Sequence, residues 1–550
     1  MNAETFFENF SLLSESPNGI QKLREMILQM AIQGKLVPQN PEDEPAQILL
    51  KRIKAEKERL VDKKQIRKTK ALPPVKINKF LFDIPETWEW VRLGEIGDWG
   101  AGATPNRKKS EYYDGSINWF KSGELNNRYI TESDEQINEL ALKECSLRLN
   151  KPEDVLIAMY GATIGKVAIL KSTATTNQAV CACTCFDGFF NEYLFLILKA
   201  YRKHFTNQGA GGAQPNISRV KIIHTLAPLP PLEEQKRIVI KVDQLMELCD
   251  QLESLQQTKY QSRIQLNNSA LSNMLDAGSP EEFAEQWMLV CDNFDLLYDN
   301  LDNVEKLKQV ILQLAVQGKL VPQDPNDEPA YVLLEKIKGK NPSLLIVDGE
   351  MPYSVPETWA WFKLGDVGRI VGGGTPKTSN DEYFCDDGIH WLTPADLYNY
   401  KQKYVSKGRR DITELGLKNS SAQLMPAGTV LFSSRAPIGY VAIAQNDICT
   451  NQGFKSCVPH KMEMNEYIYY FLKFAVEEIE NAASGTTFKE ISGKAFGQIL
   501  IPLPPLEEQM RIVAKVDQLM ALCGELETRI KKAQDNSEKL TTAMVSSVVG

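Results

Sequence analysis

The side chains that most often perform chemistry are sparse in this sequence. Only four histidines occur in 550 residues, and none is spaced from a cysteine or another histidine like the ligands of a zinc site. These histidines are His204, His224, His390 and His460. Three cysteines alternate at Cys181, Cys183 and Cys185, which predicts buried thiols on one face of a strand. We find no pattern here for a metal centre or a nucleophile.

Three glycine-rich segments resemble phosphate-binding loops only superficially. "GATIGK" (161–166) has one residue too few between its glycines, and Val167 follows where a P-loop needs Ser or Thr. "GAGGA" (209–213) and "VGGGTP" (371–376) lie in no clear βαβ unit with a downstream acid. The Asn-Pro-Pro-Tyr or Asp-Pro-Pro-Tyr motif of a nucleic-acid methyltransferase is also absent from the sequence. We therefore expect no catalytic residue, metal or cofactor in this chain, although sequence does not reveal paired carboxylates brought together by the fold.

Composition and charge place the chain among ordinary globular proteins. It is 43% hydrophobic and 24% charged, and its length predicts several domains. No signal peptide and no apolar run of membrane-spanning length is visible, so we expect a cytoplasmic protein with reduced thiols. The net charge of −8 arises mainly in residues 226–345, which alone carry −8, so the other segments could present local basic surfaces.

The sequence contains a long internal repeat of order A-B-C, A-B-C. Segment A is "ILQMAIQGKLVPQNPEDEPA" (27–46), which returns as "ILQLAVQGKLVPQDPNDEPA" (311–330). Segment C is "LPPLEEQKRIVIKVDQLMELC" (229–249), which returns as "LPPLEEQMRIVAKVDQLMALC" (503–523). The B regions between them share only landmarks, including "IPETWEW" with "VPETWAW" (84–90, 355–361) and a Thr-Asn-Gln triplet. A repeated frame with dissimilar insertions predicts one scaffold that carries two different surfaces.

The C segments have the pattern of long helices with a heptad seam. Pro231 and Pro505 suit a first helical turn, and no proline or glycine interrupts the first helix before Gly278. Apolar residues then recur at steps of four and three, which favours coiled-coil pairing over an ordinary amphipathic core helix. The seam residues are Ile238, Val242, Leu245, Cys249, Leu252, Ile512, Val516, Leu519, Cys523 and Leu526.

The A segments begin as helices and are predicted to end at Gly34 and Gly318, each acting as a C-cap. A second short helix is expected over 45–54 and 329–338. In the first half it continues into a basic run at 51–70, which is either a solvated helix and linker or an arm near a phosphate backbone. The second half has no equivalent run.

The B regions are rich in turns and short β-type runs, with helices expected at 191–204 and 465–483. The fold class is therefore α+β: two mostly β domains with some helices, joined by long helices that pair as a coiled coil, with an internal pseudo-two-fold repeat. The predicted boundaries are 1–75 for an N-terminal helical scaffold, 76–227 for the first β domain, 228–345 for a central helical spacer, 346–501 for the second β domain and 502–550 for a C-terminal helix.

Taken together, the duplicated segments resemble the specificity subunit of Type I restriction-modification systems over nearly the whole chain. Both "GKLVPQ" segments, both "PETW" segments, "GATP…YYDGSINW" with "GGTP…YFCDDGIHW", and both "LPPLEEQ" helices carry the resemblance. It implies that each B region is a target-recognition domain that reads one half of a split sequence in double-stranded DNA. The resemblance further implies that the long helices pair as an antiparallel coiled coil, which sets the half-site separation. It also implies docking of two methyltransferase (modification) subunits, which bind S-adenosylmethionine, and of two restriction motor subunits, which use ATP. The chain itself would be non-catalytic.

Loop residues able to contact base edges or phosphates were selected by type and by their position near glycines. In the first domain they are Thr104, Asn106, Arg107, Lys108, Lys109, Lys121, Asn126, Asn127, Arg128, Gln214 and Asn216. In the second they are Thr375, Lys377, Thr378, Arg435, Asn451, Gln452, Thr486, Thr487 and Lys489. For the Asn-Gln pairs at 177–178 and 451–452, which occur in both halves, a structural turn is at least as good an interpretation.

The sequence is also compatible with two other interpretations. The architecture also suits a coiled-coil scaffold that binds only protein, or the specificity subunit of a related system whose restriction and methylation partner is fused. An acidic stretch at 281–306 does not favour DNA, and we expect it to be an exposed helical insertion or a partner-facing surface.

Overall fold

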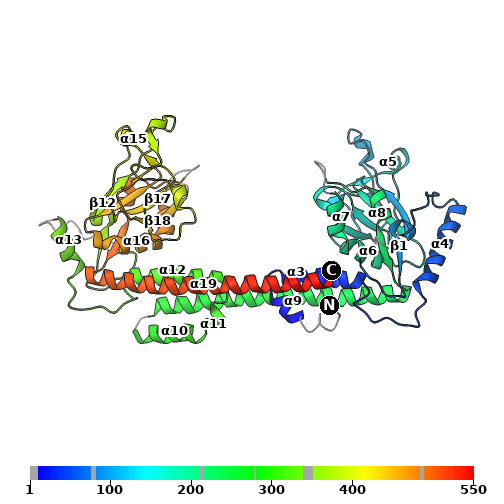
Figure 1. Cartoon of the computed structure of the whole chain (residues 1–550), viewed down its shortest axis with the longest axis horizontal. Coiled ribbons are helices and arrows are strands. Elements are labelled where there is room, and N and C mark those ends of the chain that lie inside the picture. The colour runs from blue at the N-terminus through cyan, green and yellow to red at the C-terminus, as the bar shows by residue number, and fades with distance from the viewer. Residues whose placement is uncertain are drawn as a thin grey trace. The chain divides into compact units, whose positions relative to one another are not determined.

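The computed structural model describes residues 10–75, 82–209, 215–277, 280–338, 351–435, 437–483 and 489–549. The chain forms two compact units (Figure 1). Unit 1 comprises Met1–Lys259 with Ala533–Gly550, and unit 2 comprises Tyr260–Lys532. The sequence-based segments 228–345 and 502–550 are thus each shared between the two units.

Each A segment folds as a helix ended by a glycine. α3 (Gly19–Ile32) precedes Gly34, and α12 (Leu301–Val316) precedes Gly318, and both glycines have φ of +71°. The N–H of the following lysine bonds back to Met30 or Leu314, which is the hydrogen-bond pattern of a Schellman C-cap. The predicted glycine C-caps are confirmed. The next helices are α4 (Ala46–Asp62) and α13 (Ala330–Lys338), so α4 runs eight residues past the predicted end and includes part of the basic run.

The two C segments form the longest helices, α9 (Leu232–Asp276) and α19 (Leu506–Val549). Each helix begins in one unit and ends in the other, so each unit combines the start of one helix with the end of its counterpart. Within unit 2, for example, Met274 near the end of α9 and Ile512 near the start of α19 belong to one hydrophobic core. This is the arrangement expected of two long helices that run antiparallel to each other.

The heptad seams pack into the cores of their own units. In α9 the first four seam residues are buried and Leu252 is partly buried, in a core shared with α3 and the β domain. In α19 the seam joins the corresponding core of unit 2, with Leu519 and Leu526 partly buried. An Arg24 ion pair to Asp250 at 2.6 Å ties α3 to α9, and Lys308 to Glu527 at 2.5 Å ties α12 to α19. Both seams therefore serve to hold a segment-A helix and a β domain onto a long helix.

Both B regions fold around a five-stranded sheet with the same order of strands. The orders are β2-β9-β6-β7-β4 in unit 1 and β12-β20-β17-β18-β15 in unit 2. Alternate residues of the central strands enter different cores, since Ile157 packs toward the helices and Leu156 toward the far side of the sheet. The strands are β2 (Gly97–Ala101), β9 (Val180–Cys185), β6 (Val155–Ala158), β7 (Val167–Leu170), β4 (Tyr129–Ile130), β12 (Gly368–Gly372), β20 (Lys455–Pro459), β17 (Val430–Ser434), β18 (Ile438–Ala444) and β15 (Tyr404–Val405).

Smaller sheets support the outer loops of each domain. Unit 1 has a three-stranded sheet of order β5-β3-β8, and unit 2 has two pairs, β13-β16 and β14-β19. Their strands are β5 (Gln136–Ile137), β3 (Ile117–Phe120), β8 (Ala174–Thr176), β13 (Phe384–Cys385), β16 (Asp411–Ile412), β14 (Trp391–Leu392) and β19 (Cys449–Thr450). The domains also contain short helices: α5 (Glu139–Glu144), α8 (Arg219–His224), α14 (Leu364–Val367), α15 (Glu414–Lys418) and α18 (Gly493–Gly497).

Each β domain begins and ends in one antiparallel ribbon. β1 (Glu89–Arg92) pairs with β10 (Leu226–Leu229), so Glu89 lies opposite Leu229 just before α9 begins. In unit 2, β11 (Ala360–Lys363) pairs with β21 (Leu500–Leu503) in the same register, ahead of α19. The chain therefore enters and leaves each domain at the same place.

The helices predicted inside the B regions are each interrupted once. α6 (Asn191–Ala200) is followed by α7 (Arg202–Gly209), with a break at Tyr201, and α16 (Asn465–Phe474) by α17 (Val476–Ala482), with a break at Ala475. α6 and α16 pack against the sheet and against α3 or α12, so they join the domain to the helical frame.

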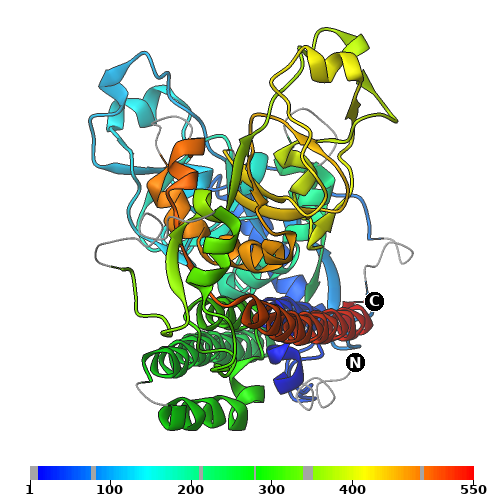
Figure 2. The ribbon, with the colours of Figure 1, turned by 90° about the vertical axis from the view of Figure 1, so that its left-hand side faces the viewer.

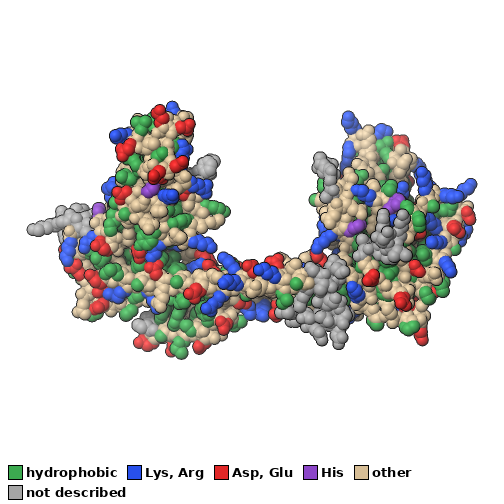
Figure 3. Space-filling model, in the orientation of Figure 1, with side chains coloured by type: hydrophobic (Ala, Val, Ile, Leu, Met, Phe, Trp, Pro, Cys, Tyr) green, Lys and Arg blue, Asp and Glu red, His purple; other side chains and the backbone are tan. Residues whose placement is uncertain are grey.

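The acidic stretch is helical, with α10 (Pro280–Asp292) and α11 (Phe294–Leu297) leading into α12. Val290 and Leu297 are buried in the core that holds Met274 of α9, and α10 lies beside the end of α9 (Figure 2). Apolar side chains gather at the surface over these helices (Figure 3). Met288 is 63% exposed and Leu289 is 50% exposed. The surface of this stretch is thus both acidic and apolar, whereas the sequence interpretation described the stretch only as acidic.

Candidate nucleic-acid interface

A buried carboxylate holds the three repeated segments of unit 1 together. Glu234, in the first turn of α9, is 1% exposed. Its two oxygens accept hydrogen bonds from the Trp88 indole at 3.0 Å and from the Gln39 amide at 2.6 Å. Thr87 in turn donates to Gln39 at 2.9 Å. One side chain from segment C therefore fixes both the "GKLVPQ" loop and the entry to the β domain.

The same set of contacts occurs in unit 2. Glu508 is fully buried and accepts from the Trp359 indole at 2.9 Å and from the Gln323 amide at 2.6 Å. A salt bridge accompanies each set: Arg237 to Asp43 at 2.5 Å in unit 1 and Arg511 to Asp327 at 2.6 Å in unit 2. We call each carboxylate with its tryptophan and glutamine a frame lock.

Burial raises the pKa of both lock carboxyls, Glu234 and Glu508, above the usual range for glutamate. The hydrogen bonds from tryptophan and glutamine, and the nearby arginine, oppose that rise without cancelling it. In both locks the raised pKa of the carboxyl therefore comes from exclusion of water.

A second set of polar contacts joins each β domain to its long helix. Arg128 bonds Glu192 of α6 at 2.7 Å and Asp243 of α9 at 2.6 Å. In unit 2, Lys403 lies 3.3 Å from Glu466 of α16 and 2.7 Å from Asp517 of α19. The neighbouring tyrosines repeat as well, since Tyr129 donates to Glu192 and Tyr404 to Glu466. Arg128, predicted to contact DNA, is thus engaged within the frame.

The glycine two residues before each Thr-Pro dipeptide allows a close approach of two chain segments. A Cβ at Gly102 would lie 2.1 Å from the carbonyl oxygen of Thr176, and one at Gly373 would lie 1.8 Å from that of Asn451. Both oxygens belong to the repeated Thr-Asn-Gln turn. Within that turn the Asn451 side chain accepts from the Gly453 N–H at 2.9 Å, as Asn177 does from Ala179 at 3.1 Å. The asparagines of both turns have a structural role, and the glycine loops lie directly on these turns.

In unit 1 the loop after β2 and the loop after β3 are cross-linked by Glu135. Its carboxylate bonds Arg107 and, at 2.9 Å, Lys121. The Arg107 guanidinium also lies 4.7 Å from the ring centroid of Tyr113 and 5.0 Å from that of Trp119. Arg107 is consequently held in one position while its side chain remains 53% exposed, which suits a planar donor that presents an edge to a ligand.

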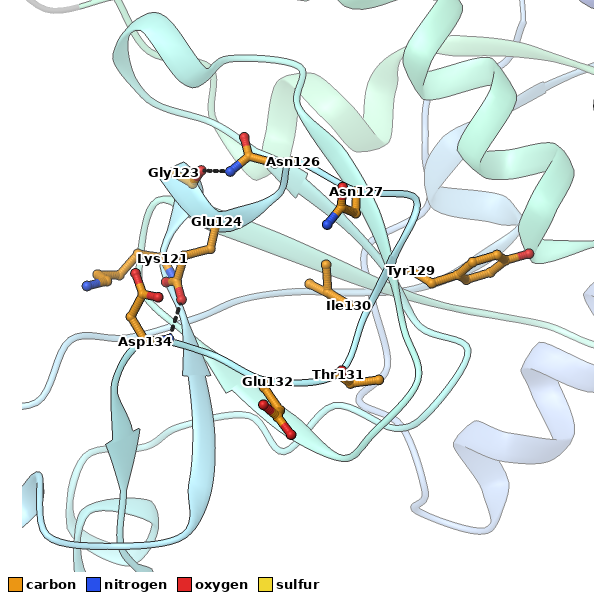
Figure 4. A pocket seen from close by; sticks show the side chains of 10 residues that line it. All are labelled: Lys121, Gly123, Glu124, Asn126, Asn127, Tyr129, Ile130, Thr131, Glu132 and Asp134. Atoms are coloured by element: carbon orange, nitrogen blue, oxygen red, sulfur yellow. Dashed lines mark hydrogen bonds between the residues drawn. The ribbon is translucent and has the colours of Figure 1, made fainter. Parts of the chain in front are cut away.

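Beside this cross-link lies a surface hollow of about 670 Å³ (Figure 4). It contains Asn126, whose amide donates to the Gly123 carbonyl at 2.9 Å, and Glu124, which accepts from the Asp134 N–H at 2.7 Å. The full lining is Lys121, Gly123, Glu124, Asn126, Asn127, Tyr129, Ile130, Thr131, Glu132 and Asp134. One lysine against three carboxylates disfavours a phosphate, whereas amides and carboxylates match the donor and acceptor groups of base edges.

The loops of unit 2 use different side chains. Thr375 bonds Gln452, which belongs to the Thr-Asn-Gln turn. Arg435 pairs through its backbone with Glu490, and Lys455 reaches the Glu490 carboxylate at 3.2 Å. Lys377 is exposed and has no carboxylate partner among the residues that the structure describes. Nothing in this domain repeats the Arg107–Glu135–Lys121 cross-link at the described positions.

The structure places the predicted loop residues in different parts of the two domains. Arg107, Lys121, Asn126 and Asn127 lie together in unit 1, with Thr104, Asn106, Lys108 and Lys109 on the adjoining loop. Lys109 is bonded to Tyr112 at 2.9 Å, and Asn216 forms a β-bridge with Tyr160. In unit 2, Thr375, Lys377 and Thr378 follow β12, whereas Asn451 and Gln452 follow β19 and Lys489 precedes the bridge at Glu490. Gln214, Thr486 and Thr487 lie outside the described residues.

Sequence reasoning missed the carboxylates of the first hollow and the role of Glu135. It selected cations and amides, although an acidic side chain also reads a base edge by accepting from an exocyclic amine. Glu124, Glu132 and Asp134 carry no motif, but they do occur within the same short stretch as Lys121, Asn126 and Asn127. That clustering of polar residues was the available signal.

The residues considered for chemistry do not converge in the described part of the chain. Cys181 and Cys183 are buried on one face of β9, as predicted, whereas Cys185 is only partly buried. Burial raises the pKa of Cys181 to about 12. "GATIGK" forms a turn between the antiparallel strands β6 and β7, so it is not a P-loop. No group of three His, Cys, Asp or Glu side chains suited to a metal ion occurs among the described residues.

Comparison with known proteins agrees with this architecture. The family model for the Type I restriction modification DNA specificity domain matches residues 85–259 and 356–533. The chain is 31% identical to the Type I restriction enzyme EcoAI specificity subunit of Escherichia coli, over 96% of this chain and 94% of that one. It is 28% identical to the EcoEI specificity subunit of the same organism over the same shares. A chain from a solved structure on assembly and conformational transition of the type I R-M system aligns with a TM-score of 0.51 and 21% identity, covering 85% of this chain and 99% of that chain.

The fold and the loops define a class of protein. It is a duplicated α+β chain whose repeated helical frame carries two polar loop surfaces. The chain belongs to the family of Type I restriction-modification DNA specificity subunits. Among the described residues, no helix is both long enough and apolar enough to cross a membrane.

Proposed function

We propose that this chain reads a split, asymmetric sequence in double-stranded DNA, with one half-site recognised by each β domain. The observation that carries the proposal is the contrast between the two units. Their frame locks use the same residue types in the same geometry, whereas their exposed loops carry different polar side chains. Equal frames with unequal loops suit one protein that presents two different base-reading surfaces.

The proposal extends to the partners. Two copies of nearly the same helical frame offer the same kind of surface twice, which suits two modification subunits, and two restriction motor subunits complete the complex. S-adenosylmethionine and ATP would be bound by those subunits. This chain would be non-catalytic and would act in the cytoplasm, where its DNA target lies.

The test is to co-express the chain with its neighbouring modification subunit and to map N6-methyladenine in the host genome by single-molecule sequencing. We expect one split motif methylated on both strands, which disappears when this chain is omitted. A motif that persists without the chain would place the specificity in another protein and would leave only a protein-binding scaffold role.

A further inference from the structure

Each unit has a groove where its β domain meets the helical frame. In unit 1 the groove measures about 300 Å³ and is lined by α6, α9 and the turn at Gly165. In unit 2 it measures about 560 Å³ and is lined by α12, α16, α19 and the start of β18 at Gly439. Gly165, just before β7, and Gly439, at the start of β18, occupy equivalent places in the repeat, and both have positive φ, +77° and +102°. The two grooves are therefore the same feature of the repeated fold.

The groove of unit 1 has more positive than negative side chains. Asp243 is its one carboxylate among the lining residues, and Arg128 already pairs with it at 2.6 Å. Three cations remain without a carboxylate partner in the groove: Lys166, Lys199 and Arg202. Lys166 is held by the Asn126 amide oxygen at 2.6 Å, and the Lys199 ammonium lies 5.5 Å from the centroid of the Phe195 ring.

The groove of unit 2 also has more positive than negative side chains, with different residues. Its two carboxylates, Glu305 and Glu527, both face Lys308, at 3.6 and 2.5 Å. Three cations again remain without a carboxylate partner in the groove: Lys401, Lys473 and Lys531. Lys473 makes a 3.5 Å hydrogen bond to the Tyr469 hydroxyl. Of the three, Lys473 is at the position of α16 that corresponds to Lys199 of α6.

The surroundings of these two lysines disfavour their charged form. Partial burial, together with the positive charges of Arg128 and Arg24, lowers the pKa of Lys199 below the usual lysine value, although Asp250 and Asp243 oppose the shift. Partial burial likewise lowers the pKa of Lys473, where Glu305 opposes the shift and Lys308 and Lys403 add to it. An anion in either groove would relieve both effects, because it supplies a charge partner to several cations at once.

We propose that both grooves bind phosphodiester groups of the DNA backbone and act as a pair of sequence-independent clamps, one for each unit. This inference rests on the proposed function, since it assigns a backbone contact to a chain that reads DNA. The division of labour follows from charge: the hollow at Asn126 and Glu124 is acidic and suits base edges, whereas the adjoining groove has three unpaired cations and suits phosphate.

The test uses the full chain in complex with its modification subunit. Variants K166Q/K199Q/R202Q and K401Q/K473Q/K531Q each remove the three unpaired positive charges from one groove. Binding of a target duplex and of a scrambled duplex is then measured over a series of salt concentrations. K236Q on α9 and K515Q on α19 are controls that each remove one exposed lysine outside the grooves. We expect each triple variant to bind both duplexes roughly tenfold or more weakly, with an unchanged ratio between them.

The salt dependence provides a second readout. The slope of log affinity against log salt should fall by about 0.9 for every phosphate contact removed, and the controls should leave it unchanged. An unchanged slope in both triple variants would overturn the clamp. Loss of the modification subunit from the complex, with the slope intact, would also overturn it and make the groove a protein-docking site. If the unaltered complex does not prefer the target duplex, the proposed function itself fails, which separates the two outcomes.

Discussion

The two units hold their β domains in the same way and expose different loops. Trp88, Gln39 and Glu234 in unit 1 have direct counterparts in Trp359, Gln323 and Glu508, with distances that agree within about 0.1 Å at each bond. By contrast, the Arg107–Glu135 cross-link of unit 1 has no counterpart among the described residues of unit 2. The part of the chain that positions the β domains is thus duplicated, whereas the exposed loops differ between the units.

Removal of the tryptophan from either frame lock should have the largest effect, and it tests whether the two locks contribute equally to stability. Trp88→Ala and Trp359→Ala should each lower the free energy of unfolding by about 3–5 kcal/mol, because a large buried ring and a hydrogen bond to a buried carboxylate are lost. Urea unfolding followed by circular dichroism measures this. Trp287→Ala, at a ring that is 38% exposed, is the control and should change stability by less than about 1 kcal/mol. A large loss of stability for only one of the two tryptophan variants would show that the two locks are not equivalent.

Next in size is the contact between each β domain and its long helix. Arg128→Ala and Lys403→Ala should each destabilise the protein by about 2–3 kcal/mol, since Glu192 and Glu466 lose their cation while they remain partly or fully buried. Susceptibility of the β domain to limited proteolysis, alongside urea unfolding, measures the loss. Lys143→Ala, on the exposed face of α5, serves as the control. Wild-type behaviour of both variants would show that these contacts do not hold the domains.

Substitutions in the loops should affect the two units differently, whereas substitutions in the frames should affect them equally. Asn127→Ala should weaken recognition in one half of the methylated motif by about 1–2 kcal/mol, and Lys377→Ala should affect only the other half. Mapping of methylated sites in cells that carry each variant gives both halves in one measurement. If either substitution relaxes both half-sites together, the assignment of one half-site to each domain is wrong.

The smallest effect is a dependence on pH that both locks share. Because burial raises the pKa of Glu234 and Glu508 in the folded chain, their contribution to stability is full below the unfolded pKa and declines as pH rises through the folded one. The double variant E234Q/E508Q has no such group to titrate. Its free energy of unfolding, relative to wild type, should therefore improve between pH 4 and pH 8. A flat difference across that range would mean that the carboxyls are not buried as described.

Local sequence patterns were sufficient for the helical frame. The absence of proline and glycine between Pro231 and Gly278 defines α9 to within two residues, and Gly34 and Gly318 end α3 and α12 because each adopts a positive φ. The repeat itself indicated which segments belong together. These features depend on neighbours in the sequence, so the sequence alone is enough to predict them.

Contacts between distant segments were not predictable in the same way. Glu234 was visible only as an acid near a helix start, favourable to the helix dipole, although its partner Trp88 is 146 residues away. The heptad seam correctly indicated a buried stripe, but its period does not say that the stripe packs into a core shared with α3 and a β domain. Arg107 and Lys121 were selected as free cations because Glu135 has no motif to mark it as their shared partner.

The two-stranded ribbons that close each β domain have a consequence for how the protein changes over generations. Because Glu89 faces Leu229, and Ala360 faces Leu503, everything between those residues departs from the frame and returns to it at a single point. Genetic exchange within the near-identical flanking segments would therefore replace a whole reading domain and leave both locks intact. A population carrying such genes acquires new sequence preferences by recombination, in one step, with no need to re-evolve the assembly that uses them.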